Sequence, residues 1–332
     1  MQVHYWQHGQ VGPYKVEKPL VLGHESSGIV VSCGADAHGL KVGDRVAIEP
    51  GISCGYCEDC RSGRYNLCSL MRFAATPPHD GTLAKYYCVP RECCFQLPPE
   101  VSLQDGALVE PLSIAVHACR QAGDMQGRSV LIFGAGPIGQ LCCSVARAFG
   151  AIEVVVTDVV NSRLEFALGK GATAVYKTDT TATTEETAVN LRKAAGLEKG
   201  AAIVMDATGS EACIDCGIQL LKRGGVFVQV GLGARKVKFP VGDICDKEAT
   251  FKGSFRYGPG DYQLAIALLR DRRVSLEGMV THQFAFEEAP DAFENVVRRR
   301  GIKSIIFGPG VDRQFAEEVQ DQSTKNGNGV SV

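Results

Sequence analysis

Residues 129–158 read SVLIFGAGPIGQLCCSVARAFGAIEVVVTD, and this stretch decides the fold of the chain. It begins with an apolar run, 129–133, that is typical of a buried parallel strand. A glycine-rich turn and a helical run follow, and a second apolar run, 153–157, ends on Asp158. Strand, glycines, helix, strand and acid in this order predict an α/β domain with a doubly wound parallel sheet that binds a dinucleotide.

Each glycine of the turn has a mechanical reason in a dinucleotide site. Gly134 makes the tight turn, Gly136 lets the pyrophosphate approach the backbone, and Gly139 lets the helix pack close to its strand. The helix N-terminus offers free N–H groups to the phosphates, and Asp158 accepts hydrogen bonds from the ribose hydroxyls. Because an acid at this position repels a 2′-phosphate, we expect NAD rather than NADP, although the nearby cation Arg163 weakens that preference. A glycine-rich turn in another kind of α/β domain is the alternative.

The bulk properties exclude several classes of protein. A chain of 332 residues suits two domains rather than one core. The net charge of −2 gives no footprint for nucleic acid, and no apolar run approaches the roughly 20 residues that span a bilayer. Residues 1–6 have neither the basic region nor the apolar core of a signal peptide. We therefore expect a cytoplasmic protein without nucleic-acid or membrane partners.

The cysteines indicate a metal site. Among the 14 cysteines, four lie in one glycine-containing loop with the spacing C-x2-C-x2-C-x7-C: Cys54, Cys57, Cys60 and Cys68. Four thiolates can enclose a tetrahedral zinc ion and so order a loop that has no core of its own. An iron–sulfur cluster is the alternative, but the last spacing is longer than in the bacterial cluster motif and no proline follows Cys68. We expect a structural zinc ion here, because four protein ligands leave no open position.

Two other motifs are ambiguous from the residues alone. His24-Glu25 follows a turn glycine, but a solvated or core-satisfied histidine beside an exposed glutamate is the commoner reading of such a pair. Cys213 and Cys216 form C-x-x-C, yet they lie on the apolar face of a helix that begins near Ser210. That position favours a core role for the two thiols over a redox role.

Outside the dinucleotide domain the pattern is less regular. Residues 1–110 predict a mostly β domain, with strand-like runs broken by Gly, Pro and Asp at 27–31, 45–48 and 84–89. Beyond residue 257 the pattern predicts two amphipathic helices and a last strand, at 261–270, 290–300 and 302–307. From Gly310 onward the chain is polar, and we expect a disordered tail.

Residues 1 to about 309 resemble the zinc-containing medium-chain dehydrogenases, specifically their polyol dehydrogenase branch. The resemblance is carried by the four-cysteine loop and by short segments at 23–28, 74–78, 109–112, 134–139 and 253–257. It implies a Rossmann dinucleotide-binding domain over 116–255 and a mostly β, GroES-like catalytic domain over 1–115 and 256–309, followed by the tail at 310–332.

The resemblance also implies roles for individual residues. His24 and Glu25 would be two ligands of a catalytic zinc ion, and Glu110 would be the acid beside the zinc-bound water. The residues implied to line the polyol pocket are Tyr5, Phe73, Arg256 and Tyr257. Those implied to bind the coenzyme are Gly134, Gly136, Pro137, Ile138, Gly139, Asp158, Arg163, Val230, Ser254 and Phe255.

The implied reaction is the zinc- and NAD-dependent oxidation of a sugar alcohol to a ketose by a homo-oligomeric enzyme. Zinc would lower the pKa of the alcohol, and the nicotinamide would accept the hydride. Xylitol to D-xylulose is the expected reaction. Sorbitol (or L-iditol) and L-arabinitol are the alternative substrates.

The remaining protein ligand of the family's catalytic zinc is a cysteine, which by alignment would fall ahead of Met1. We therefore expect the sequence to begin inside the catalytic domain, and the chain as written to bind NAD but to oxidise little xylitol. Two alternatives to an active enzyme stay open: a catalytically impaired NAD-binding chain, and a zinc-free relative such as a quinone reductase. The His24-Glu25 pair argues against the second of these.

Overall fold

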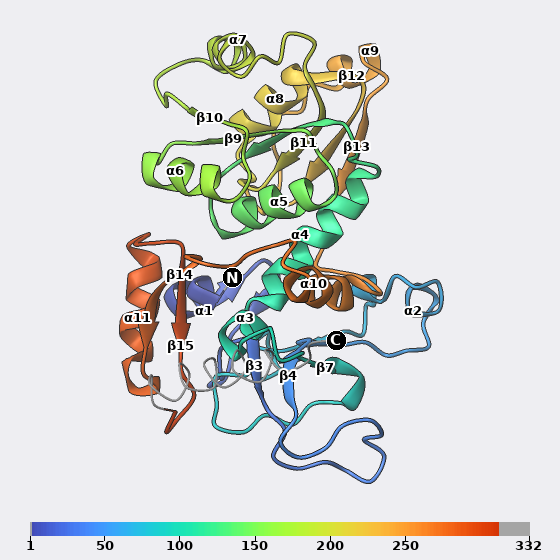
Figure 1. The fold of residues 1–332 in the computed structure, drawn as a ribbon, viewed down its shortest axis with the longest axis vertical. Coiled ribbons are helices and arrows are strands. Elements are labelled where there is room, and N and C mark those ends of the chain that lie inside the picture. Colours follow the sequence, from blue (N-terminus) through green and yellow to red (C-terminus); the bar gives the residue numbers. More distant parts are fainter. Residues whose placement is uncertain (1, 312–332) are drawn as a thin grey trace, which may run out of the picture. The chain divides into compact units, whose positions relative to one another are not determined.

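A computed structural model of the protein describes residues 2–311. The chain divides into two compact units, whose elements are labelled in Figure 1. Within the described residues, the first unit contains 2–110, 258–272 and 276–311, and the second contains 111–257 and 273–275. The tail predicted at 310–332 lies, from residue 312 on, outside the described residues.

The second unit is built on a six-stranded sheet in which all neighbouring strands run parallel. Its strands are β8 (Ser129–Phe133), β9 (Glu153–Asp158), β10 (Ala174–Lys177), β11 (Ala201–Asp206), β12 (Leu221–Gln229) and β13 (Thr250–Gly253). The order is β10-β9-β8-β11-β12-β13, so the direction of travel reverses between β8 and β11. This topology confirms the predicted doubly wound α/β sheet.

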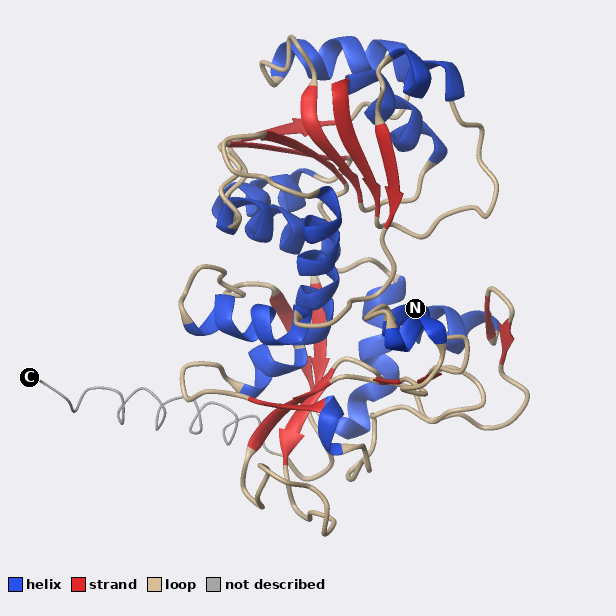
Figure 2. Ribbon diagram, turned by 90° about the vertical axis from the view of Figure 1, so that its right-hand side faces the viewer, coloured by secondary structure: helices blue, strands red, loops and turns tan. Residues whose placement is uncertain are grey.

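Helices cover both faces of this sheet, as Figure 2 shows. They are α4 (Val109–Ala122), α5 (Pro137–Ala148), α6 (Asn161–Gly169), α7 (Thr184–Ala194), α8 (Glu211–Leu220) and α9 (Val241–Asp246). Val130, Leu131 and Ile132 of β8 are fully buried, as expected for a central strand covered on both faces. Helix α5 begins with Pro137, whose missing N–H and fixed φ suit the first turn of a helix.

The first unit contains several small sheets instead of one large sheet. Its strands are β1 (Gln10–Val11), β2 (Tyr14–Lys15), β3 (Ser26–Ile29), β4 (Arg45–Ile48), β5 (Gly51–Ile52), β6 (Arg72–Phe73), β7 (Cys94–Gln96), β14 (Val280–Phe284) and β15 (Lys303–Ile306). They form an antiparallel sheet with the order β3-β4-β7, a parallel pair β14-β15, and two antiparallel pairs, β1-β2 and β5-β6. This arrangement agrees with the irregular, mostly β pattern of the sequence.

The helices of the first unit join segments that are far apart in the sequence. They are α1 (Gln2–His8), α2 (Glu58–Arg61), α3 (Leu103–Ala107), α10 (Asp261–Arg270) and α11 (Ala289–Val297), with 3-10 turns at Tyr65–Leu67, Arg91–Cys93 and Phe286–Glu288. Tyr262 of α10 is buried, and its hydroxyl donates to the carbonyl oxygen of Ile48 at 3.1 Å. Its ring centroid lies 4.9 Å from that of Phe95 in β7. The segment after residue 257 therefore completes the core around β4 and β7.

The strand predicted at 84–89 is wrong. These residues pair with no strand of the described chain. Just before them, the N–H groups of residues 81–83 donate to carbonyl oxygens of residues 21–23 at 2.7–2.9 Å. The apolar run is thus part of a loop whose backbone is tied to the segment that leads into His24.

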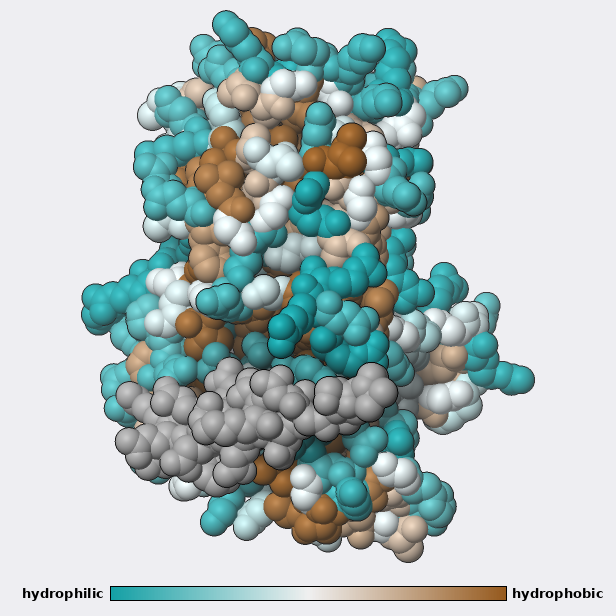
Figure 3. Space-filling view, in the orientation of Figure 1, coloured by the Kyte–Doolittle hydropathy of each residue, from teal (hydrophilic) through white to brown (hydrophobic). Residues whose placement is uncertain are grey.

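The described helices include none that is long and apolar enough to cross a membrane. The face drawn in Figure 3 carries hydrophilic side chains over most of its area, with apolar side chains in smaller groups. Exposed apolar side chains in small groups are ordinary on a folded protein and need no partner to explain them.

Candidate active site

Three side chains from two distant segments of the first unit converge on one spot. His24 and Glu25 directly precede strand β3, and Glu110 lies in the first turn of helix α4. Their possible ligand atoms all lie within 4.8 Å of one another, and His24 and Glu110 are buried. An imidazole and two carboxylates are donors typical of a catalytic zinc site. The donor set and its convergence therefore fit a zinc ion.

The backbone around His24 allows little freedom. Gly23 has a φ of +92°, in the region that favours glycine. A Cβ at this position would come within 2.9 Å of the backbone nitrogen of Leu83, and a Cβ at Gly81 would collide with the carbonyl oxygen of Gly23. The two loops lie in close backbone contact, so the direction in which His24 and Glu25 leave the chain is fixed by the fold.

Glu110 reaches the cluster from the N-terminal end of a long helix. Helix α4 spans 14 residues, and Glu110 is its second residue, followed by Pro111. The first turn of a helix lies at the positive end of the helix dipole, which favours a carboxylate. The helix therefore supplies a negative side chain at a place where its charge is stabilised.

Lys303 of strand β15 pairs with Glu25 inside this cluster. Burial raises the pKa of Glu25, but the positive charges of Lys303 and His24 oppose it, and the net pKa is lowered. Two carboxylates at one site repel each other, so Lys303 offsets one of the two negative charges. The sequence alone does not single out Lys303, because 278 positions separate it from Glu25 and no local motif marks it.

The four cysteines of the loop also converge. The Sγ atoms of Cys54, Cys57, Cys60 and Cys68 all lie within 4.8 Å of one another, and none of the four is in a disulfide. The Sγ atoms of Cys54 and Cys60 are 3.9 Å apart. Thiolates at the corners of a zinc tetrahedron, with Zn–S bonds of about 2.3 Å, would be roughly 3.8 Å apart. The loop therefore has the spacing of a closed tetrahedral site.

Backbone N–H groups point at the sulfurs of this loop. The N–H of Cys57 donates to Sγ of Cys54 at 3.3 Å, and the N–H of Cys54 donates to Sγ of Cys68 at 3.4 Å. Desolvation raises the pKa of Cys54, but backbone hydrogen bonds from Tyr56 and Cys57 outweigh it and lower that pKa to about 6. These donors stabilise the thiolate form, which is the form that binds a metal ion.

In the second unit, the glycine turn between β8 and α5 has the shape that a dinucleotide requires. Gly134 has a φ of +92°, and a Cβ there would lie 2.7 Å from Cγ2 of Thr208. A Cβ at Gly139 would collide with the carbonyl oxygen of Gly134, whereas one at Gly136 would meet nothing within 4 Å. The first and last glycines are thus needed for close packing, and the middle one faces open space next to the N-terminus of α5.

Asp158, at the end of β9, is anchored beside the glycine turn. Its Oδ2 accepts from the N–H of Ala135 at 2.7 Å, and its Oδ1 accepts from the N–H of Val160 at 2.9 Å. Each carboxylate oxygen has a second lone pair for a further donor. The acid is therefore held in one orientation and keeps acceptor capacity for hydroxyl groups.

Comparison with known proteins agrees with the metal-ligand clusters of the first unit and with the dinucleotide turn of the second. A family model described as "Alcohol dehydrogenase GroES-like domain" matches residues 1–99, and one described as "Zinc-binding dehydrogenase" matches residues 137–271. The probable D-xylulose reductase A of Neosartorya fischeri is 50% identical over 306 residues, covering 92% of this chain and 85% of the relative. The chain belongs to the zinc-binding dehydrogenases.

Further relatives of this zinc-binding dehydrogenase are similar in sequence or in structure. The D-xylulose reductase A of Aspergillus oryzae is 48% identical over 309 residues, covering 93% of this chain and 86% of the relative. The crystal structure of L-idonate 5-dehydrogenase from Escherichia coli matches with a TM-score of 0.83 at 30% identity, covering 92% of this chain and 86% of that one. The 2R,3R-butanediol dehydrogenase of Bacillus subtilis matches with a TM-score of 0.80 at 27% identity, covering 92% and 87%. The predicted class, a zinc- and nicotinamide-dependent dehydrogenase of the polyol branch, is confirmed.

The structure distributes the four predicted substrate residues over both units of the dehydrogenase. Phe73, in β6, is buried, and its ring meets the ring of His24 edge-on at a centroid distance of 5.4 Å. Tyr5, in α1, is buried in the first unit. Arg256 and Tyr257 belong to the second unit, where the Arg256 guanidinium lies 4.8 Å from the ring centroid of Phe255.

Asp206 is a residue near the glycine turn that sequence reasoning missed. It ends β11 with no exposed surface, and its carboxylate accepts from the N–H groups of Thr208 and Gly209 and from the side chain of Gln229 at 2.6–3.0 Å. These bonds shape the turn after β11, which presses Thr208 against Gly134. The signal was present, since an acid at the carboxyl end of the strand next to β8 lies at the point where the strand order reverses.

Two further predictions can be placed. The hydroxyl of Ser254, just after β13, is buried and has no hydrogen-bond partner among the described residues; its role in coenzyme binding stays a prediction. Cys216 is buried in the core cluster with Cys213 packed against it, and burial raises the pKa of Cys216 to about 12. This confirms that the C-x-x-C pair belongs to the core, because a protonated buried thiol is unreactive.

Proposed function

We propose that this dehydrogenase oxidises xylitol to D-xylulose with NAD. The observation that carries the proposal is the convergence of His24, Glu25 and Glu110 at one site in the unit that matches the GroES-like model. The choice of xylitol is supported by relatives that are about half identical to this chain and bear the name D-xylulose reductase.

In this proposal, His24, Glu25 and Glu110 would hold the catalytic zinc ion, which would supply polarisation of the substrate alcohol and a lower pKa for it. Glu110 would then be a zinc ligand in place of the cysteine that the family resemblance implies, and the chain would be active, in contrast to the expectation that it oxidises little xylitol. Glu110 supplies the third donor, stabilised by the N-terminus of α4. Lys303 holds the Glu25 carboxylate and reduces the repulsion between the two acids. The ring of Phe73 packs edge-on against the His24 ring and would help to orient the imidazole for metal binding.

The second unit would bind the coenzyme along the carboxyl edge of its sheet. Gly134, Gly136 and Gly139 admit the pyrophosphate, and Pro137 and Ile138 form the N-terminal turn of α5 beneath it. Asp158 would accept from the ribose hydroxyls. The other assigned residues follow strand ends or the next helix start: Arg163, Val230, Ser254 and Phe255.

Other parts of the assignment remain proposals from the family resemblance. Tyr5, Phe73, Arg256 and Tyr257 are assigned to polyol binding, and Cys54, Cys57, Cys60 and Cys68 to a structural zinc ion. We also propose a homo-oligomer and a cytoplasmic location. The location is supported by the 14 cysteines, all of which are free thiols, as expected in a reducing compartment.

Steady-state kinetics test the proposal. The values of kcat/KM would be measured for xylitol, sorbitol and L-arabinitol, each with NAD and with NADP. We expect the highest value for xylitol with NAD, and we expect Asp158→Ala to narrow the preference for NAD over NADP. A higher value for either other polyol, or no oxidation of any of the three, would contradict the assignment.

A further inference from the structure

Cationic side chains gather around a hollow in the second unit. The hollow has a volume of about 390 Å³, and a neighbouring one of about 290 Å³ shares Lys222 and Arg223 with it. The cations that line the two hollows are Arg128, Arg192, Lys199, Lys222, Arg223 and Lys247. Glu198 is the one acid among the lining residues. The linked hollows therefore carry a large excess of positive charge.

These cations lie at the amino edge of the parallel sheet. Arg128 directly precedes β8, Lys199 precedes β11 by two residues, and Lys222 and Arg223 are in the first residues of β12. The coenzyme turn and Asp158 follow the carboxyl ends of β8 and β9. Because all strands of the sheet run parallel, the basic hollow and the coenzyme turn lie at opposite edges. The hollow is thus separate from the coenzyme site.

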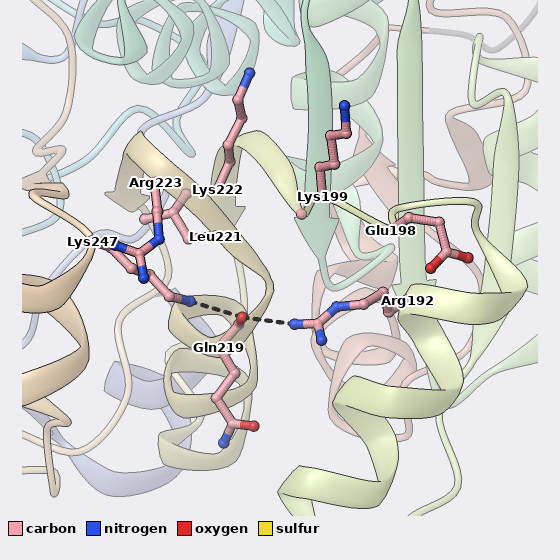
Figure 4. A pocket seen from close by; sticks show the side chains of 9 residues that line it. Arg192, Glu198, Lys199, Gln219, Leu221, Lys222, Arg223 and Lys247 are labelled. Carbon is pink, nitrogen blue, oxygen red and sulfur yellow. Dashed lines mark hydrogen bonds between the residues drawn. The ribbon is translucent and has the colours of Figure 1, made fainter.

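Two of the cations are held rigidly by the end of helix α8. Arg192 and Lys247 donate to the carbonyl oxygen of Gln219 at 3.1 and 2.8 Å (Figure 4). Lys247 also donates to the carbonyl oxygen of Ile218 at 2.6 Å. These carbonyls belong to the last turn of the helix, where the N–H of Leu221 also donates to the carbonyl oxygen of Ile218. The bonds fix both charges in the hollow before any ligand arrives. The Nε of Arg192 is buried without a hydrogen-bond partner among the described residues.

The remaining cations have little to neutralise them. The side chains of Lys199 and Lys222 form no hydrogen bond or ion pair with any described residue, and their amino groups point in the same direction in Figure 4, away from Gln219. Arg223 donates to the carbonyl oxygen of Asp246 at 3.0 Å. Burial lowers the pKa of Lys247, and Arg192 and Arg223 lower it further against the pull of Asp243. The cations therefore repel one another, and a bound anion would relieve that repulsion.

We propose that this hollow binds a small molecule that carries at least two phosphate groups. A single carboxylate would leave most of the lining cations unneutralised, whereas a diphosphate concentrates several negative charges in a small volume. The hollow is in the size range of small-molecule sites, about 300–1,000 Å³, and is larger than one phosphate group needs. Arginine side chains among the lining residues match the geometry of phosphate oxygens.

The test is a calorimetric titration of the full chain with pyrophosphate, in the presence of saturating NAD so that the coenzyme turn is occupied. The variant Lys199→Gln/Lys222→Gln removes two exposed charges from the hollow. The matched control, Lys18→Gln/Lys41→Gln, removes two exposed charges from the first unit. We expect saturable binding to the unmodified chain, a loss of affinity of at least about tenfold in the hollow variant, and less than about a twofold change in the control.

Several results would overturn the proposal. One is the absence of saturable binding, and another is an equal affinity for the hollow variant and the control, which would place the anion elsewhere. Because pyrophosphate also chelates metal ions, only the difference between these two variants counts as support. Citrate binding as tightly as pyrophosphate would contradict the choice of phosphate. A short oligonucleotide that bound more tightly than pyrophosphate, with the same dependence on Lys199 and Lys222, would contradict a small-molecule ligand and indicate a polymeric anion. A thermal melt of each variant verifies that it is folded.

Discussion

The two metal-ligand clusters of the first unit are built in different ways. The four cysteines lie in one loop, residues 54–68, and of the four only Cys68 is buried. His24, Glu25 and Glu110 come from distant segments, and two of the three are buried. One cluster offers four sulfurs and is closed by them, whereas the other offers nitrogen and oxygen and leaves a position open.

On this difference we propose different duties for the two metal ions. In the cysteine loop an ion would replace a missing core, so its loss should unfold the loop. Around His24, the backbone contacts of Gly23 with residues 81–83 and the pairing of Glu25 with Lys303 hold the ligands without an ion. Loss of that ion should remove activity and leave the fold in place.

The largest expected effect is that of His24→Ala on catalysis. We expect kcat/KM for xylitol to fall by at least about 10³-fold, because a site with two ligands no longer fixes the metal that lowers the alcohol pKa. The temperature of unfolding should change little. His38→Ala, which removes an exposed histidine, is the control. A variant His24→Ala that kept more than a tenth of the activity would show that this cluster is not the catalytic centre.

The next effect concerns stability and the other cluster. Cys57→Ser should lower the free energy of unfolding by about 4 kcal/mol or more, since it opens the closed metal site of a loop with little core. Urea titration followed by circular dichroism measures the change. Cys33→Ser replaces an exposed free thiol and should be neutral. Unchanged stability and zinc content in Cys57→Ser would rule out a structural zinc ion here.

A third prediction uses two acids, Glu25 and Glu49, that differ in their neighbours. Lys303 helps to lower the pKa of Glu25, whereas Glu49, close to the cysteine loop, has no such cation, and burial raises its pKa to about 7. Between about pH 4.5 and 7 the Glu49 carboxyl is protonated in the folded chain and ionised in the unfolded chain. The free energy of unfolding therefore falls as the pH rises through this range. Glu49→Gln removes this loss. Raising the pH from 5 to 8 should therefore lower the free energy of unfolding of the variant by about 3 kcal/mol less than that of the parent. The exposed Glu92→Gln is the control, and an identical pH dependence in both variants would refute the assignment.

The smallest effect is expected for Lys303→Met. Loss of this partner should weaken zinc binding at the His24 cluster by about 10-fold, as is common when a residue that supports a metal ligand is removed. The lowered pKa of Glu25 contributes stability that is present above its ordinary value of 4.5 and is lost as the pH falls below it. In the variant the zinc ion should therefore dissociate at a higher pH than in the parent. A competition titration with a chelator at several pH values measures the zinc affinity and the pH of dissociation, with Lys18→Met as the control. Equal zinc affinities of Lys303→Met and the control would mean that Lys303 does not support Glu25 as a ligand.

The same contrast explains how much could be predicted from the sequence. The cysteine loop and the turn from Gly134 to Gly139 are local, so their spacing alone indicated a metal site and a dinucleotide site. The pairing of His24-Glu25 with Glu110 depends on a fold that brings residues about 85 positions apart together, and only the family resemblance indicated it. Neither a local motif nor the family resemblance indicated Lys303.

The prediction of a strand at 84–89 was wrong for a related reason. Its apolar residues suggested pairing in a sheet, but the N–H groups of residues 81–83, just before it, donate to the loop that carries Gly23 and not to a strand. Asp206 was visible at the end of a predicted strand. Its importance became clear only when the sheet order placed β11 next to β8.

The zinc content of the purified chain and of its two ligand variants tests the central claim most directly. The claim is that one unit holds two independent zinc sites, one for structure and one for chemistry. Elemental analysis should give two zinc ions per chain for the parent and one each for His24→Ala and Cys57→Ser, with cobalt substitution showing thiolate absorption only where the cysteine site is intact. One zinc ion in the parent, or loss of both ions in His24→Ala, would contradict it.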